Sequence, residues 1–162
     1  MRSWRHGNWR VHTAAACLFV ATAISGCGGF GRQWSATTAV VQPPADITGA
    51  WQGTWSSEAT GHGDALRCII THVEQNTYSA RFHARFMKII SGRYTTIMQV
   101  THADGVWHFT GESNLGWFGG GVYRQEGEIR DGIYEARYES KYDRGLLRMS
   151  RPDEQVAADP TK

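Results

Sequence analysis

The chain has 162 residues, of which 17 are lysine or arginine and 15 are aspartate or glutamate, for a net charge of +2. Three of the basic residues and none of the acidic ones lie within residues 1–26, so the remainder carries a net charge of −1. Charge balance therefore gives no argument for nucleic acid or an anionic membrane surface as a partner. The length that remains suits one domain with one core.

A basic and then apolar leader opens the chain. Arg2, Arg5 and Arg10 precede an apolar stretch, Thr13–Ile24, that is too short to span a bilayer comfortably. This order is typical of a signal peptide rather than of a stable transmembrane helix. We expect residues 1–26 to be removed from the mature protein.

The leader ends in Ile24-Ser25-Gly26-Cys27, which resembles the lipobox of bacterial lipoproteins. The resemblance covers these four residues and the leader before them. It implies cleavage before Cys27 and acylation of that cysteine, which anchors the protein to a membrane of the cell envelope; a plain secretory signal is the alternative. Two or three acyl chains anchor stably, since each buried methylene contributes about 0.8 kcal/mol. Gly28 stands where family members retained at the inner membrane have aspartate, so the outer membrane is favoured.

Two segments outside the periodic core have the composition of flexible chain. Residues 27–46 are rich in Gly, Ser, Ala and Thr and contain Pro43-Pro44, so we interpret them as a tether that holds the domain off the membrane. Residues 152–162 have two prolines, scattered charge and almost no apolar content, which is typical of a disordered tail. The folded domain is predicted to span residues 47–151.

Apolar and polar residues alternate with a period of two through this domain, which is typical of strands, and no segment shows a helical stripe. The turns Gln75-Asn76, Asp104-Gly105 and Asp131-Gly132 supply residues that tolerate positive φ. The predicted strands are Gly49–Ser56, Ala65–Glu74, Thr77–Met87, Arg93–His102, Val106–Ser113, Gly121–Ile129, Ile133–Ser140 and Leu146–Arg151.

Eight sequential strands with short turns predict an all-β fold, an antiparallel up-and-down barrel, because closure removes exposed strand edges. Large and small residues alternate on one face of the third and seventh strands, as they do inside a small barrel that is filled or leaves a cavity. These inner residues are Tyr78, Ala80, Phe82, Ala84 and Phe86, and then Tyr134, Ala136, Tyr138 and Ser140.

The two halves of the domain match each other at an offset of 56 residues. Both contain Gly-x-Trp, then a glycine-containing turn, then Tyr-x-Ala-Arg. Two interpretations stand, a duplication of a four-stranded repeat and a coincidence of barrel patterning. The matching pairs are Gly49 and Gly105, Trp51 and Trp107, Thr54 and Thr110, Ser57 and Ser113, Gly63 and Gly119, Tyr78 and Tyr134, Ala80 and Ala136, and Arg81 and Arg137.

The segment Gly49-Ala50-Trp51 resembles the opening strand of calycin barrels, the lipocalin and avidin group, whose first strand carries Gly-x-Trp. The resemblance is confined to this short motif, and the lipocalin C-terminal helix has no counterpart. It implies a calycin-like barrel in which Trp51 packs against a basic side chain near the end of the last strand, here Arg148 or Arg151. We expect Trp51 to plug a barrel end, with direct ligand contact as the alternative.

Residue types with potential chemistry do not form a catalytic or metal-binding motif. Cys68, with no partner left after Cys17 and Cys27, is interpreted as a small buried hydrophobe. The charged hairpin Glu139–Arg144 offers acid and base groups without a nucleophile paired to an orienting base. The histidines outside the leader form no compact set of metal ligands. They are His62, His72, His83, His102 and His108.

The glycine-rich segment Gly116–Gly121 lacks the lysine and the following helix of a phosphate-binding loop. We interpret its two large aromatic residues, Trp117 and Phe118, as a cap on the barrel mouth. An exposed contact patch is the alternative.

These observations together predict a membrane-anchored extracytoplasmic lipoprotein whose barrel is not an enzyme and binds a small apolar or aromatic ligand. The predicted ligand-binding residues are Phe82, Tyr134, Tyr138 and Trp51, and Cys27 is the predicted site of lipid attachment. The first alternative is an envelope protein with a solid barrel core that interacts with other proteins or has a structural role, and a hydrolase is the least favoured. No cofactor, metal or nucleic-acid partner is predicted.

Overall fold

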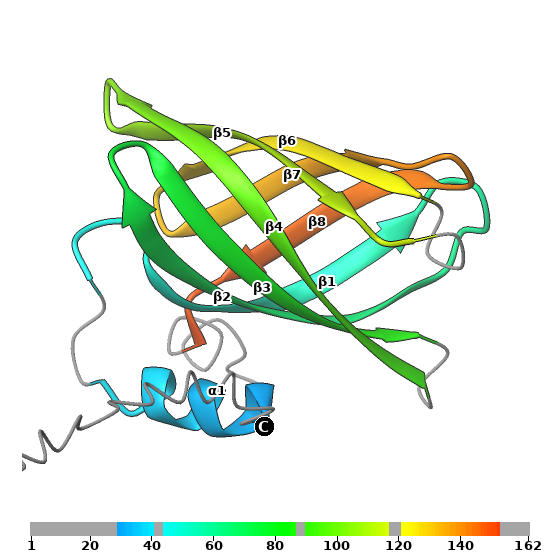
Figure 1. Cartoon of the computed structure of the whole chain (residues 1–162), viewed down its shortest axis with the longest axis horizontal. Helices are drawn as coiled ribbons and strands as arrows, with labels where there is room; N and C mark the ends of the chain where they lie inside the picture. The colour runs from blue at the N-terminus through cyan, green and yellow to red at the C-terminus, as the bar shows by residue number, and fades with distance from the viewer. Residues whose placement is uncertain (1–28, 41–43, 87–89, 117–120, 153–162) are drawn as a thin grey trace, which may run out of the picture.

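A computed structural model of the chain describes residues 29–40, 44–86, 90–116 and 121–152. The predicted lipobox with Cys27, the pair Trp117 and Phe118, and the predicted tail after Pro152 lie outside these residues. Within them are one helix and eight strands (Figure 1). The elements are α1 (Phe30–Thr38), β1 (Gly49–Ser57), β2 (Gly63–Glu74), β3 (Thr77–Phe86), β4 (Ile90–Ala103), β5 (Val106–Asn114), β6 (Val122–Arg130), β7 (Ile133–Glu139) and β8 (Arg144–Ser150).

The strands form a closed barrel in which each pairs antiparallel with its neighbours in the chain, and β1 pairs with β8. The predicted all-β, eight-stranded, up-and-down barrel is therefore confirmed. Closure leaves no strand of the sheet with an unpaired edge. Several strands extend beyond the predicted ends because the ladder continues to the loops; β4 begins at Ile90 rather than at Arg93.

The tight turns have the backbone that their residues favour. Asp104 and Gly105 have φ values of 52° and 77°, and Asp131 and Gly132 have 51° and 75°. Two successive positive φ values are the pattern of a type I′ hairpin, whose twist matches that of the flanking strands. Asp-Gly at both places thus fixes the β4–β5 and β6–β7 connections.

The predicted inner faces are confirmed where the structure describes their side chains. On β3 Tyr78, Ala80, Phe82 and Ala84 are all buried. On β7 the buried residues are Tyr134, Ala136 and Tyr138. Matched positions of the two halves thus share an inner location, yet Trp51 is buried while its match Trp107 is only half-buried. The duplication stays a prediction.

Helix α1 lies within the segment interpreted as a flexible tether. It packs on the outside of the barrel wall, where Phe30 is buried and its ring centroid lies 5.2 Å from that of His83. One turn later, the guanidinium of Arg67 lies 4.9 Å from the Trp34 ring centroid. The helix has no side-chain N-cap and no acidic residue in its first turn. Arg81 of β3 also donates a hydrogen bond to the side-chain oxygen of Gln33, and such contacts with the wall stabilise a short helix more than intrinsic propensity does.

Candidate functional site

One end of the barrel, where β1 begins and β8 finishes, is closed by Trp51, which is 1% exposed. Its indole N–H donates a hydrogen bond to the carbonyl oxygen of Ile47 at 2.9 Å. The guanidinium of Arg151 lies 4.1 Å from the ring centroid. Arg151 also donates to the carbonyl oxygens of Thr48 at 2.6 Å and Asp46 at 2.8 Å, so it holds the chain segment before β1 against the plug.

Arg151 is therefore the basic partner that the calycin resemblance implied for Trp51. The other candidate, Arg148, points to the outside of the barrel and pairs with Glu135 at 2.8 Å. The indole N–H of Trp51 thus has a hydrogen-bond acceptor, and the face of its ring is covered by a guanidinium. Trp51 thus sits as the expected plug, and it does not line the cavity at the other end.

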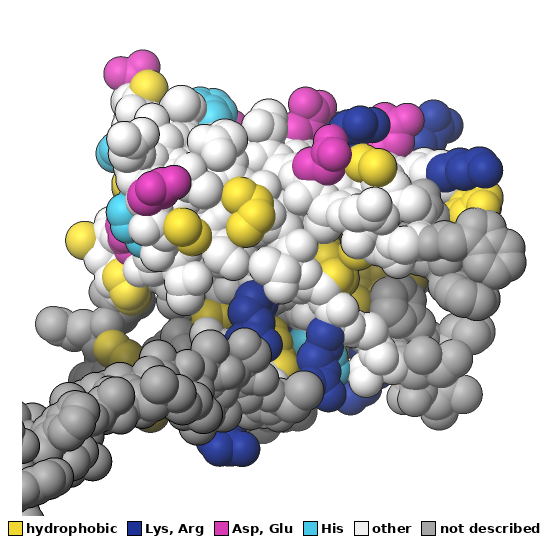
Figure 2. Space-filling view, viewed as in Figure 1, with side chains coloured by type: hydrophobic (Ala, Val, Ile, Leu, Met, Phe, Trp, Pro, Cys, Tyr) yellow, Lys and Arg dark blue, Asp and Glu magenta, His cyan; other side chains and the backbone are white. Residues whose placement is uncertain are grey.

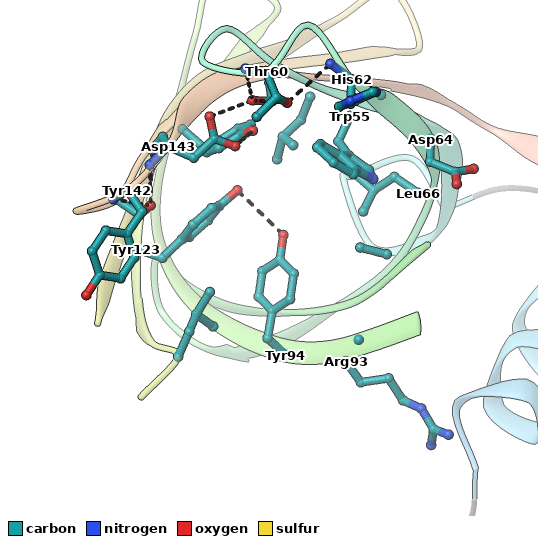
Figure 3. A pocket seen from close by; sticks show the side chains of 18 of the residues that line it. Trp55, Thr60, His62, Asp64, Leu66, Arg93, Tyr94, Tyr123, Tyr142 and Asp143 are labelled. Carbon is teal, nitrogen blue, oxygen red and sulfur yellow. Dashed lines mark hydrogen bonds between the residues drawn. The ribbon is translucent and has the colours of Figure 1, made fainter. Parts of the chain in front are cut away.

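The opposite end opens into a cavity of about 1130 Å³ (Figure 3). This volume is slightly larger than the range of about 300–1,000 Å³ that is usual for small-molecule sites in proteins. The wall is apolar and aromatic, whereas the mouth is polar. Wall residues include Trp55, Leu66, Tyr94, Leu115, Tyr123 and Leu147, and mouth residues include Ser57, Thr60, His62, Ser140 and Asp143.

Four aromatic rings from four strands form a continuous series along the cavity, which we call the aromatic ladder. Phe82 of β3 stacks on Tyr94 of β4 with ring centroids 4.9 Å apart. Tyr94 meets Tyr123 of β6 edge to face at 5.4 Å, and Tyr123 stacks on Tyr138 of β7 at 5.4 Å. Offset stacks and edge contacts of this kind are favourable ring geometries. The ladder gives a ligand ring several faces and edges to pack against.

The hydroxyl groups of Tyr94 and Tyr123 point toward each other, with 3.5 Å between their oxygens (Figure 3). That distance is well beyond the usual 2.7–2.8 Å for a hydroxyl pair, so the bond is weak. Burial is the main cause that raises the pKa of both phenols above the ordinary value of 10. Both are therefore neutral at physiological pH and keep hydrogen-bonding capacity for a ligand group.

A hydrogen-bonded cluster orders one side of the mouth. Ser57 donates to one carboxylate oxygen of Asp143 at 2.7 Å, and the Tyr138 hydroxyl donates to the other at 2.8 Å. Thr60 donates through its hydroxyl to the Ser57 oxygen at 3.0 Å. Burial first, and then Asp143, raises the pKa of Tyr138. The cluster ties the β1–β2 loop to the β7–β8 loop, and both oxygens of the carboxylate are engaged in it.

The predicted ligand-binding residues are divided between the two ends. Tyr138 lines the cavity, and Phe82 lies in the ladder behind Tyr94. Tyr134 lies toward the closed end, with its ring 6.2 Å from that of Trp51 and 4.8 Å from that of Phe109. The structure therefore does not bring the four residues into one site.

Sequence reasoning missed Tyr94, Tyr123 and Trp55, which line the cavity. The signal for the first two was present, since the same alternation of inner and outer residues runs through β4 and β6. The Trp55 indole N–H donates to the carbonyl oxygen of Arg85 at 2.8 Å, which links β1 to the end of β3 across the mouth. A contact between strands so far apart has no signal in local sequence.

The buried side-chain amide of Gln125 lies beside the aromatic ladder. The Tyr134 hydroxyl donates to Gln125 Oε1 at 3.3 Å, while Gln125 Nε2 has no hydrogen-bond partner among the described residues. Gln125 is opposite Tyr138 in the β6–β7 ladder. A water or a ligand acceptor that reached this amide would relieve the cost of burying it unpaired.

The residues weighed for chemistry are dispersed. Cys68 is fully buried, and burial raises the pKa of its thiol, so it is protonated and packs as the small hydrophobe that was predicted. His83 lies under α1 and His102 stacks on Trp107. In the part of the chain that the structure describes, no group of three His, Cys, Asp or Glu side chains could hold a metal ion. No described helix is long and apolar enough to cross a membrane.

Comparisons of the chain with protein-family models, with curated proteins and with solved structures give no match. The class of protein is therefore described from its fold and its cavity. The protein is a closed eight-stranded antiparallel barrel, consistent with a calycin-like fold, with one plugged end and one end open to an aromatic cavity.

Proposed function

We propose that the protein is a lipid-anchored extracytoplasmic lipoprotein whose barrel binds a small apolar or aromatic ligand and catalyses no reaction. The observation that carries this proposal is the cavity at the open end, lined by the rings of Tyr94, Tyr123 and Tyr138. A concave, largely apolar site with a few polar groups at its mouth is the usual form of a small-molecule site.

The chemistry of the wall suggests which ligands suit it. Rings of the ladder favour a flat aromatic or apolar body, and the neutral phenols of Tyr94 and Tyr123 favour a group that accepts or donates one hydrogen bond. Because these hydroxyls bond weakly to each other, a ligand can displace that contact at little cost.

The anchor rests on the lipobox that ends at Cys27 and on the leader before it. Lipid on that cysteine would hold the barrel at the membrane, with the outer membrane favoured because Gly28 follows. The cavity makes a solid-core interaction protein the weaker alternative. A hydrolase has less support, because the Cys68 thiol is buried and the Asp143 carboxylate is engaged by Ser57 and Tyr138.

Titration with the uncharged aromatic dye N-phenyl-1-naphthylamine tests the binding site. We expect the dye to fluoresce on binding, and we expect Tyr94→Ala to weaken binding about tenfold, because lost ring contact of roughly 1.4 kcal/mol corresponds to that factor. Trp107→Ala is the matched control, since Trp107 is also a half-buried ring but lies outside the cavity lining. Equal effects of the two substitutions, or no binding at all, would contradict the proposed site.

A further inference from the structure

Charged side chains are sorted between two sides of the barrel wall. On the side formed by β5–β8, arginines and glutamates alternate and form ion pairs. Arg124 pairs with Glu112 at 3.0 Å, and Arg148 pairs with Glu135 at 2.8 Å. Basic and acidic groups largely cancel there.

The side formed by β2, β3 and β4 carries more basic than acidic residues, since its acidic residues are Asp64 and Glu74 at the two ends of β2. From Gln75 to Ala103, a stretch that contains all of β3 and β4, the sequence has no aspartate or glutamate. Four arginines of these strands define what we call the basic wall: Arg67, Arg81, Arg85 and Arg93. Among the described residues, none of the four forms an ion pair. Figure 2 shows basic side chains without acidic ones in the lower half of the view, and both kinds in the upper half.

Three of these arginines are close enough to act on a shared neighbour, while Arg81 donates to the side-chain oxygen of Gln33 in α1. His83 lies among them, and its pKa is lowered by burial first and then by Arg93, Arg67 and Arg85. Figure 3 shows that the Arg93 side chain points away from the cavity and toward the outside of the barrel. The basic wall thus faces the outside of the barrel, while the backbone of Arg85 and part of Arg93 also border the cavity mouth.

Helix α1 places the predicted anchor beside this wall. Phe30 packs on His83 and Trp34 packs on Arg67, while Arg32 between them is exposed. Cys27 is three residues before Phe30 in the sequence, so the chain can separate them by at most about 11 Å. That is close to the Debye length of about 8 Å at physiological ionic strength. Lipid on Cys27 would therefore hold the arginines near the headgroups, where their charge is only partly screened.

We infer that the basic wall, together with Arg32, docks on anionic lipid headgroups of the membrane that carries the anchor. This inference rests on the proposed anchor and adds an orientation to it. The barrel lies on its side wall, with Arg85 and Arg93 near the cavity mouth. The net charge near zero conceals this segregated basic surface, because it averages the two sides of the barrel.

Vesicle co-sedimentation tests the inference with the mature chain from residue 27 onward, which keeps every described residue, carrying Cys27→Ser to remove the lipid. Vesicles of phosphatidylcholine mixed with phosphatidylglycerol are compared with vesicles of phosphatidylcholine alone. We expect binding to the anionic vesicles, little binding to the neutral ones, and a strong loss of binding at high salt.

The decisive variant carries Arg32→Gln, Arg85→Gln and Arg93→Gln. Each arginine near an anionic surface strengthens binding about fivefold, so we expect a loss of about a hundredfold. The control carries Arg124→Gln, Arg137→Gln and Arg148→Gln, which changes the net charge equally on the opposite side of the barrel and should leave binding within about twofold of the parent. Circular dichroism checks that both variants fold.

Three outcomes would overturn the inference: equal binding to both kinds of vesicle, equal losses in both triple variants, or tighter binding to duplex DNA than to anionic vesicles at the same salt. The parent chain alone supplies the first and third, so the test does not depend on the variants folding. The assay contains no acyl group, whereas the anchor itself is tested by the mass of Cys27 in protein from cells. A failure of one proposal can therefore be told apart from a failure of the other.

Discussion

The two ends of this barrel use aromatic residues in opposite ways. At the closed end, Trp51 is buried with its N–H bonded to Ile47 and its face covered by Arg151. At the open end, Tyr94 and Tyr123 face a cavity and their hydroxyls are left 3.5 Å apart. A side chain whose hydrogen-bonding group and ring face both have partners stabilises the fold. Side chains that keep free hydrogen-bonding capacity beside a cavity are suited to bind a ligand. Substitutions at one end should therefore change stability, and substitutions at the other should change binding.

The largest expected effect is at the plug. Trp51→Ala should lower the free energy of unfolding by about 3–5 kcal/mol, because it removes a buried ring and leaves a cavity. Denaturant unfolding measures this. Trp107→Ala, at the position that matches Trp51 in the second half, should have a clearly smaller effect because Trp107 is only half-buried. Equal losses would show that the closed end has no special role in stability.

A smaller loss is expected where Arg151 braces the plug. Arg151→Gln removes the cation from the Trp51 face and weakens the hydrogen bonds to Thr48 and Asp46, so we expect a loss of about 2–3 kcal/mol. Arg148→Gln is the control, since it breaks an exposed ion pair worth about 0–1 kcal/mol. Thermal unfolding of both variants gives the comparison. A larger loss of stability in Arg148→Gln would contradict the claim that Arg151 stabilises the closed end.

The tyrosines of the open end should make the fold sensitive to alkaline pH. Burial raises the pKa of Tyr94 and Tyr123 in the folded state, so the unfolded chain releases these protons first as the pH rises past 10. Their contribution is thus present below pH 10 and is lost above it. The denaturant concentration at the unfolding midpoint should fall as the pH rises past 10. In Tyr94→Phe this midpoint should fall less steeply with pH. Unchanged steepness in that variant would argue against a buried phenol.

The smallest effect is expected at α1, outside both ends. Burial is the first cause that lowers the pKa of His83, and Phe30 of α1 packs against its ring, so protonation favours a state in which α1 has left the wall. The stability of this contact is present above pH 6.5 and is lost as the pH falls below it. The protection of α1 amides from hydrogen exchange, after correction for the intrinsic pH dependence of the exchange rate, should fall over that range. His83→Gln should remove the pH dependence, and a variant that keeps it would exclude His83 as its source.

Sequence reasoning reached the barrel because its signals are local. Alternation placed Tyr78 and Phe82 inside, and Asp-Gly pairs fixed two hairpins through their own φ preferences. The resemblance to calycins narrowed the partner of Trp51 to two arginines, and the structure identifies Arg151.

What sequence reasoning missed depends on position along the barrel axis and on contacts between distant segments. The alternation of residues along a strand separates the inside of the barrel from the outside, but it does not tell toward which end a residue lies. Tyr134 and Tyr138 were therefore predicted to share one site, although only Tyr138 lines the cavity. Helix α1 was missed because its contacts to the wall, with His83, Arg67 and Arg81, join segments far apart in the sequence. The basic wall was visible as an acid-free stretch, but the net charge averaged it away.

Native mass spectrometry of the protein, extracted gently from the cells that make it, shows whether the cavity at the open end holds a ligand. We expect an extra mass of a small molecule that disappears on denaturation, that persists in Trp107→Ala, and that is reduced in Tyr94→Ala. Covalent acyl groups on Cys27 would remain after denaturation and so would be counted separately. An identical mass before and after denaturation would contradict a ligand-filled cavity at the open end.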